Sequence, residues 1–270
     1  MRESNELERI PGHEVANHRI DAWWWLVAAV IGIIILLATI SPDPYWRVIR
    51  FVSDGLLVTV GVTLSAFVLT LFLGLIAALG RLSRNGFIRW ITTIYVEIAR
   101  GIPLLVQLLF WYFAFPSLIQ TFGKFLQFQP FVRYHANPFT MAILGLTFCY
   151  AAYMSEIYRA GIQSIPKGQN EAARSLGMTH NQSMRHIILP QAFKVILPPV
   201  GNEFISLLKD SSLVSVVAVA DMTRRGREFM AANFIPVQTW MMIALLYLVM
   251  TLISARIVAW IERKTRTEDR

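Results

Sequence analysis

The chain has 270 residues, of which 55% are hydrophobic, and its mean hydropathy of +0.50 places it among membrane proteins before any motif is considered. This composition leaves no stretch for a soluble domain of useful size, and membrane topology with anionic lipid headgroups explains the formal charge of +8 better than nucleic acid does. The single cysteine, Cys149, lies in an apolar stretch and excludes an intrachain disulfide.

Several apolar runs reach or approach the roughly 20 residues that cross a hydrocarbon core. We therefore expect an all-α fold, a polytopic transmembrane helical bundle of about six spans. The expected spans are Trp23–Ile40, Leu56–Leu79, Ile91–Ile119, Phe139–Ile162, Ala192–Leu208 with an apolar continuation to Ala220, and Val237–Ile261. The first follows a polar tail rather than a small-residue cleavage site, which favours a retained anchor over a signal peptide.

The basic residues predict which side of the membrane each segment occupies. With the N-terminus inside, the segments that face the cytoplasm carry thirteen lysines and arginines, and the outer segments carry seven. Six spans then place both termini, and the polar loop between spans four and five, in the cytoplasm. We expect a multi-pass protein of the cell (inner) membrane.

Two carboxylate–arginine pairs lie inside the expected spans. Glu97 and Arg100 are three residues apart in span three, as are Glu156 and Arg159 in span four, so each pair can meet on one helix face. Both pairs lie towards the expected cytoplasmic ends, which favours structural pairs over groups that gate the pathway or contact substrate. The Gly-Ile-Pro sequence after Arg100 predicts a local kink.

The polar loop after span four predicts two short helices joined at a bend. Glu171 is expected to open the first helix, near its partially positive end, and Gly177 is expected to end it. Thr179 and Gln182 have the spacing of a capping box, which starts a second helix that runs from His180 to Leu189 and is limited by a proline.

The second of these helices carries an apolar ridge. Met184, Ile187 and Ile188 share one face at the i, i+3, i+4 spacing. Such a ridge on a cytoplasmic loop predicts a groove in a partner protein. The alternative is an amphipathic connector that packs on its own domain.

Span five predicts a substrate site. Pro198 and Pro199 are expected to interrupt its helix, and irregular backbone at membrane depth is tolerated where it lines a wet cavity. Polar residues then follow along an apolar stretch: Asn202, Glu203, Ser206, Lys209, Asp210 and Ser211. Glu203 lies near mid-membrane without a basic residue three or four positions away, whereas Lys209 and Asp210 are expected to neutralise each other. In one interpretation, Glu203 accepts the ammonium of an amino acid substrate, and Lys209 or freed backbone amides bind the carboxylate of that substrate. In the other, Glu203 is protonated and hydrogen-bonded inside the bundle.

Four separated motifs, in this order, resemble those of the permeases of polar amino acid ABC uptake systems, the histidine, glutamine, arginine and glutamate group. They are RGIPLLVQL at 100–108, SEIYRAGIQSIPKGQ at 155–169, the loop pattern, and PPVGNEFISLLKDSSLVSV at 198–216. The loop pattern, typical of the site where such subunits contact an ATPase, consists of Glu171, Ala172, Ala173, Gly177, Ile187, Leu189 and Pro190, to which we add Met184. The resemblance covers roughly residues 54 to 262.

The resemblance implies a permease subunit that imports polar L-amino acids by alternating access. Its implied partners are a dimer of cytoplasmic ABC ATPases, a second permease subunit in a homodimer or heterodimer, an extracytoplasmic amino-acid-binding protein and the lipid membrane, but no nucleic acid. ATP and Mg²⁺ would be bound by the ATPase and no cofactor by this chain. Residues 1–53 would form a cytoplasmic tail and an extra anchor, residues 54–262 the transmembrane domain, and residues 263–270 a cytoplasmic tail.

The motifs that are missing from the sequence agree with a non-catalytic subunit. It contains no G-x-x-x-x-G-K-[ST] phosphate loop, no H-E-x-x-H or paired-cysteine metal pattern, and no convergent set of catalytic groups. A secondary transporter or channel driven by an ion gradient is the alternative, but it leaves the loop pattern unexplained. The transported amino acid, acidic ones included, stays open.

Overall fold

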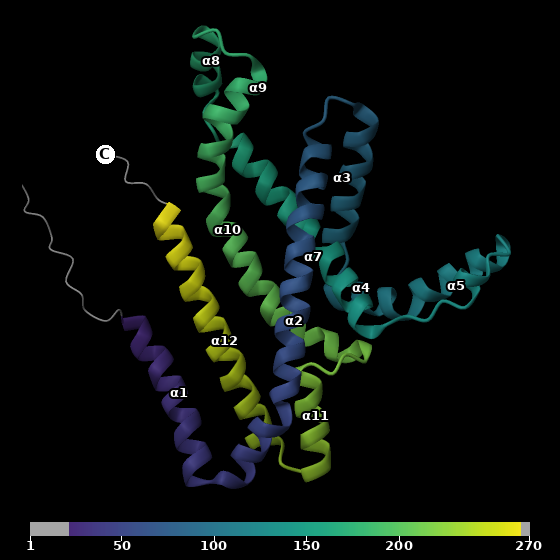
Figure 1. Cartoon of the computed structure of the whole chain (residues 1–270), viewed down its shortest axis with the longest axis vertical. Coiled ribbons are helices and arrows are strands. Elements are labelled where there is room, and N and C mark those ends of the chain that lie inside the picture. Colours follow the sequence, from purple (N-terminus) through teal and green to yellow (C-terminus); the bar gives the residue numbers. More distant parts are fainter. Residues whose placement is uncertain (1–21, 266–270) are drawn as a thin grey trace, which may run out of the picture.

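The computed structural model describes residues 22–265, in which helices are joined by short turns and no strand occurs (Figure 1). The long α-helices are α1 (Ala22–Ile40), α2 (Pro42–Arg81), α3 (Gly86–Gly101), α7 (Pro138–Gln163), α10 (Leu189–Asp210) and α12 (Pro236–Thr265). The short ones are α4 (Leu104–Leu109), α5 (Phe115–Phe125), α6 (Gln129–Val132), α8 (Lys167–Ser175), α9 (His180–Ser183) and α11 (Met222–Asn233). Two π-helices, η1 (Phe110–Ala114) and η2 (Met184–Ile188), and one 3₁₀-helix, η3 (Ser211–Val217), complete the chain. The predicted all-α fold is confirmed, and the predicted tails at 1–21 and 266–270 lie outside the described residues.

Within residues 22–265, five helical segments are long and apolar enough to cross a membrane. They are Trp23–Ile40, Pro42–Arg81, Leu104–Phe125, Pro138–Gln163 and Pro236–Thr265. Four of them contain the predicted spans one, two, four and six. The sixth long element of the bundle is α10, which is less apolar and packs against α7 and α12.

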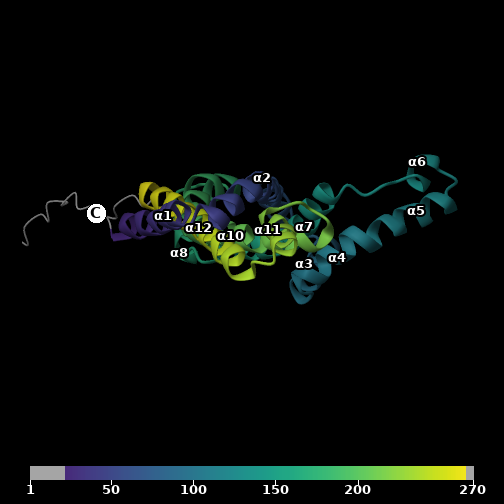
Figure 2. The ribbon, with the colours of Figure 1, turned by 90° about the horizontal axis from the view of Figure 1, so that it is seen from below.

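The predicted third span, Ile91–Ile119, is wrong as one helix. The chain leaves the helical region at Ile102 (φ −101°, ψ 130°) and Pro103 (φ −56°, ψ 137°), so α3 ends and α4 begins. The physical reason is that a proline disfavours the α conformation in the residue before it. After this break, α4 and η1 pack against α7, whereas α5 projects away from the bundle together with α6 (Figure 1 and Figure 2).

The predicted interruption at Pro198 and Pro199 is also wrong. Both prolines lie inside α10, which continues as one helix to Asp210. The φ of proline is helical, but each interior proline lacks an N–H donor and its ring crowds the carbonyl four residues earlier, so α10 carries both costs at this point. The packing of α10 between α7 and α12 holds the helix through this point. The irregular backbone lies further along, at η3 and at Ala218, whose φ is 63°.

The core of the bundle is the contact between α2 and α7, which is the most extensive helix–helix contact within residues 22–265. Small residues on α2 allow this close approach, and Gly74 is the clearest case. A Cβ atom at Gly74 would lie 2.7 Å from the Cβ of Met154 and 3.2 Å from the carbonyl oxygen of Ala151, both on α7. The extra helix α1 packs on α12 through Val27, Val30 and Leu252.

The connections gather at the two ends of the bundle. The α2–α3 turn and the segment from α8 to η2 lie at one end, and the α1–α2 connection and α11 lie at the other (Figure 1). This arrangement places the two loops predicted to be cytoplasmic on the same side of the bundle.

Candidate functional site

A cavity of about 410 Å³ lies where the break between α3 and α4 faces α7 and α10. Its wall includes the cation of Arg100 and the carboxylates of Glu203 and Asp210. The remaining lining comes from Gly101, Ile102, Pro103, Leu104, Cys149, Tyr150, Tyr153 and Ser206. The cavity is therefore lined by residues of both signs of charge, its wall is about as polar as it is apolar, and its volume falls in the range of small-ligand sites.

The structure divides the residues predicted as the substrate site. Glu203, Ser206 and Asp210 share one face of α10 and line the cavity. Asn202 and Lys209 are exposed and do not line it, and Ser211 is buried and donates a hydrogen bond to the carbonyl oxygen of Leu208 (2.7 Å). Three of the six predicted residues are thus brought together.

The predicted pairing of Lys209 with Asp210 is wrong. No ion pair joins them among the described residues, and Asp210 instead accepts a hydrogen bond from the hydroxyl of Tyr150 (2.7 Å). Neighbours in a helix point about 100° apart, so adjacent charges seldom meet. The sequence did not predict Tyr150 as the partner of Asp210, because this tyrosine lies in an apolar stretch of a different span.

The break that forms one wall of the cavity is held by Gln107, a buried residue of α4. Its side-chain Nε2 donates to the carbonyl oxygens of Ala99 (2.7 Å) and Ile102 (2.8 Å). These carbonyls belong to the end of α3, where helix geometry leaves acceptors without partners. Gln107 thus fixes the backbone on which Arg100 is mounted, a role that the motif RGIPLLVQL did not reveal by spacing alone.

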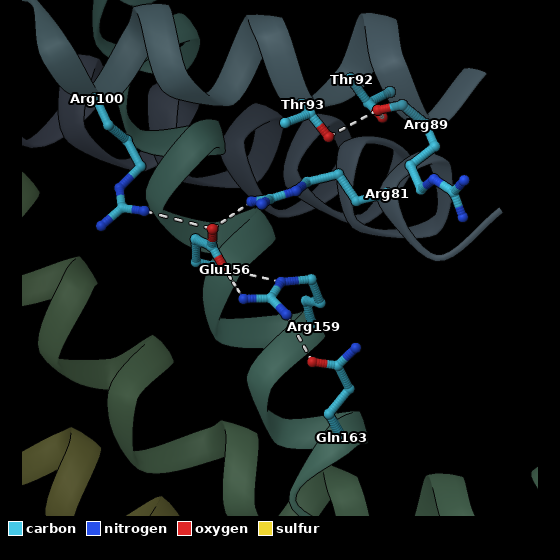
Figure 3. A network of polar contacts seen from close by, with 8 residues as sticks. All are labelled: Arg81, Arg89, Thr92, Thr93, Arg100, Glu156, Arg159 and Gln163. Atoms are coloured by element: carbon cyan, nitrogen blue, oxygen red, sulfur yellow. Dashed lines mark hydrogen bonds and ion pairs between the residues drawn. The ribbon is translucent and has the colours of Figure 1, made fainter. Parts of the chain in front are cut away.

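Arg100 also belongs to a charge cluster around Glu156 (Figure 3). Three arginines from three helices bind this carboxylate: Arg81 of α2, Arg100 of α3 and Arg159 of α7. Arg159 donates from Nε (2.9 Å) and Nη2 (2.8 Å) to Oε2, and Arg81 forms a close ion pair with Oε1. Arg100 Nη1 lies 3.4 Å from Oε1. The cluster ties the α2–α3 hairpin to α7.

The two predicted pairs have different outcomes. Glu156 and Arg159 do form an ion pair on one face of α7. The pair of Glu97 and Arg100 is wrong, since Glu97 is exposed and forms no ion pair among the described residues. Arg100 turns instead to Glu156 on the neighbouring helix, where the partly buried carboxylate is a stronger partner than an exposed one.

At the loop end, the first predicted helix is present as α8. It begins at Lys167, directly after Pro166, so Glu171 lies in its second turn rather than opening it; this corrects the expected helix start. Gly177 adopts a left-handed conformation (φ 81°), as the predicted helix stop requires. The amide of Gly177 donates to Arg174 O (2.9 Å), and that of Met178 donates to Ala173 O (3.1 Å). These two bonds form a Schellman motif.

The second predicted helix starts correctly and ends differently. The amide of Gln182 donates to Thr179 Oγ1 (3.3 Å), and the amide of Thr179 donates to Gln182 Oε1 (2.8 Å), so the capping box is present. Pro190 does not end the helix, because η2 leads without a break into α10. Pro190 has no N–H to donate to a carbonyl of the preceding turn. The π-helix η2, which ends two residues before this proline, changes the hydrogen-bond pattern of that turn. The loop helix and α10 are therefore one continuous element.

The predicted apolar ridge is partly covered by the loop itself. Ile188 is buried, and Met184 and Ile187 are half-buried. The most exposed apolar side chain of the loop is Leu176 at the bend, at 83% exposure. Of the other predicted coupling residues, Ala173 is buried, whereas Glu171, Ala172, Gly177, Leu189 and Pro190 are exposed. Sequence periodicity could not identify Leu176, because it lies at the end of a helix.

The described residues thus form a polytopic helical bundle with a cavity between its helices and a folded helical loop at one end. Residues 70–267 match the model of the family described as binding-protein-dependent transport system inner membrane component, and the chain belongs to this family.

Curated relatives and solved structures agree with the family. The chain is 40% identical over 189 residues to the L-cystine transport system permease protein TcyB of Bacillus subtilis, which covers 70% of this chain and 74% of the relative. It is 33% identical over 221 residues to the glutamine transport system permease protein GlnP of Escherichia coli, covering 82% and 95%. A crystal structure of an amino acid ABC transporter with histidines aligns with a TM-score of 0.70 at 38% identity, covering 84% of this chain and 97% of that one.

Proposed function

We propose that this chain is the permease subunit of an ATP-driven importer that carries polar L-amino acids into the cell. The observation that carries the proposal is the cavity, in which Arg100 and the two carboxylates Glu203 and Asp210 line one space. A free amino acid bears a carboxylate and an ammonium, and charge-assisted hydrogen bonds to both ends would orient it. The names of the relatives, which specify L-cystine and glutamine, support this substrate class.

The charges of the cavity favour neutral and cationic amino acids. Two carboxylates face one guanidinium, and Lys209 lies outside the cavity. A second acidic group on the substrate would meet like charge, which disfavours binding by electrostatic repulsion. Substrate residues in this proposal are therefore Arg100, Glu203, Ser206 and Asp210.

The implied partners follow from the family and from the loop. The family description specifies binding-protein dependence, which supports an extracytoplasmic binding protein as the source of the amino acid. We assign the exposed loop surface, with Leu176 at its tip, to a dimer of cytoplasmic ATPases that bind ATP and Mg²⁺. This chain would itself hold no cofactor, catalyse no reaction and pair with a second permease subunit. Both termini would then lie on the cytoplasmic side of the cell membrane.

The continuous helix from the loop to the cavity supplies the coupling device. The chain is helical from His180 through Asp210 without a break, a length of about 45 Å at 1.5 Å per residue. Its first turns belong to the loop, and its last turns carry Glu203 and Asp210. Closure of the ATPases would move the loop, and a rigid helix would pass this displacement to the cavity wall. ATP-driven movement then changes which side of the membrane the cavity faces.

Uptake by the reconstituted complex tests the proposal. Vesicles that contain this chain with its ATPase and binding protein are supplied with ATP inside and with labelled arginine, glutamine or cystine outside. Glu203→Gln is expected to lower uptake at least tenfold, because a charge-assisted bond to the ammonium is lost. Lys209→Gln is the matched control, since Lys209 lies on the same helix outside the cavity. Equal uptake by Glu203→Gln and the wild type would refute the site.

A further inference from the structure

Arg100 lies at the boundary between the cavity and the charge cluster around Glu156. Its side chain lines the cavity, and its Nη1 lies 3.4 Å from Oε1 of Glu156 in the charge cluster. Its guanidinium also lies 5.3 Å from the ring centroid of Tyr153, another residue of the cavity wall. One guanidinium is therefore within reach of both an internal carboxylate and the space assigned to substrate.

Glu156 does not depend on Arg100 for its hydrogen bonds. Arg159 and Arg81 bind its two oxygens at shorter distances than Arg100 does. The Arg100 side chain is 41% exposed, compared with 13% for Arg81 and 32% for Arg159. Three guanidinium groups around one carboxylate also leave an excess of positive charge. Among the three, Arg100 is the one whose departure costs the cluster least.

We propose that Arg100 exchanges Glu156 for the α-carboxylate of the transported amino acid. The substrate carboxylate would accept bidentate hydrogen bonds from Arg100 on α3, while the substrate ammonium would be bound by Glu203 and Asp210, which line the same cavity from α10. The inference rests on the proposed function and gives Arg100 the role for which the sequence had suggested Lys209.

The exchange couples occupancy of the cavity to the contact between α3 and α7. Without substrate, the ion pair from Arg100 to Glu156 joins these helices near the loop end of α7 (Figure 3). When substrate binds, this link is released, and the cluster retains Arg81 and Arg159. During release of the amino acid, Glu156 competes for Arg100 and lowers the affinity of the cavity. Glu156 thus acts as an internal competitor of the substrate carboxylate.

The test compares an amino acid with its amide, which keeps the ammonium and the side chain but lacks the carboxylate charge. The purified permease–ATPase complex is titrated calorimetrically, without binding protein, with L-arginine or L-glutamine and with the corresponding α-carboxamide. The wild type is expected to prefer the acid by about tenfold or more, the range of a hydrogen bond between charged groups. Arg100→Gln is expected to bind acid and amide equally. Arg89→Gln, an exposed position on the same helix, is the matched control and keeps the preference.

Glu156→Gln separates exchange from a merely structural role. If Glu156 competes for Arg100, the variant binds the acid several-fold more tightly and the amide unchanged. If the pair only holds the helices together, both ligands bind more weakly, which would overturn the exchange. Should this variant fail to assemble, Glu156→Asp, which shortens the carboxylate side chain, is titrated in its place with the same two outcomes. If the wild type transports these amino acids but binds acid and amide equally, the exchange is overturned and the proposed function stands. If the complex transports none of them, both are overturned.

Discussion

Replacing Gly177 by alanine tests whether the bend of the loop depends on one backbone conformation. Gly177 has φ 81°, and no atom lies within 4 Å of the place where a Cβ would be. The penalty is therefore conformational rather than steric, about 1–2 kcal/mol for a left-handed non-glycine residue. This free energy corresponds to a 5–30-fold change in an equilibrium. We expect the end of α8 to open 5–30 times more often in Gly177→Ala.

Hydrogen exchange at the amide of Met178 measures this opening, because that amide donates to Ala173 O in the Schellman motif. Gly168→Ala is the matched control: position 168 lies in the first turn of α8, also with open space around it, so alanine is expected to leave the helix intact or to stabilise it slightly. ATP-driven uptake is expected to fall in Gly177→Ala and to be retained in Gly168→Ala. Unchanged Met178 exchange in Gly177→Ala would refute the reasoning.

Three further substitutions probe the packing, the cavity wall and the loop tip. Gly74→Ala forces a Cβ to within 2.7 Å of Met154 and is expected to cost about 1–3 kcal/mol in thermal unfolding, whereas Gly32→Ala, with nothing within 4 Å, changes little. Gln107→Leu removes two hydrogen bonds at the end of α3, so we expect about 1–3 kcal/mol less stability and weaker substrate binding in calorimetry; an unaltered affinity would contradict its positioning role. Leu176→Glu places a charge on a side chain that is 83% exposed, and it is expected to leave the fold intact while the ATPase no longer co-purifies. Normal co-purification would exclude the loop tip from the ATPase contact.

The sequence predicted best those features that depend on residues close together in the chain. The capping box of Thr179 and Gln182 and the helix stop at Gly177 involve backbone groups within a few positions, so spacing alone defines them. Predicted spans one, two, four and six were also confirmed, because length and hydropathy are local properties. The resemblance to a family added the function, which no local pattern could supply.

The features that were missed depend on packing between distant segments. Pro198 and Pro199 were expected to break a helix that packing between α7 and α12 keeps intact. Glu156 has one partner three residues away, which the sequence indicated, and two partners on α2 and α3, which it did not. The cavity likewise joins residues some 100 positions apart. Helix periodicity places a residue on a face but does not say which helix lies opposite.

The energy source for uptake is the measurement that tests the central claim most directly. Proteoliposomes that contain this chain, its ATPase and its binding protein are loaded with ATP, and ionophores collapse all ion gradients before labelled amino acid is added. We predict that uptake continues and stops when ATP is replaced by a non-hydrolysable analogue. Uptake that needs an ion gradient and proceeds without ATP would contradict the assignment and favour a secondary transporter.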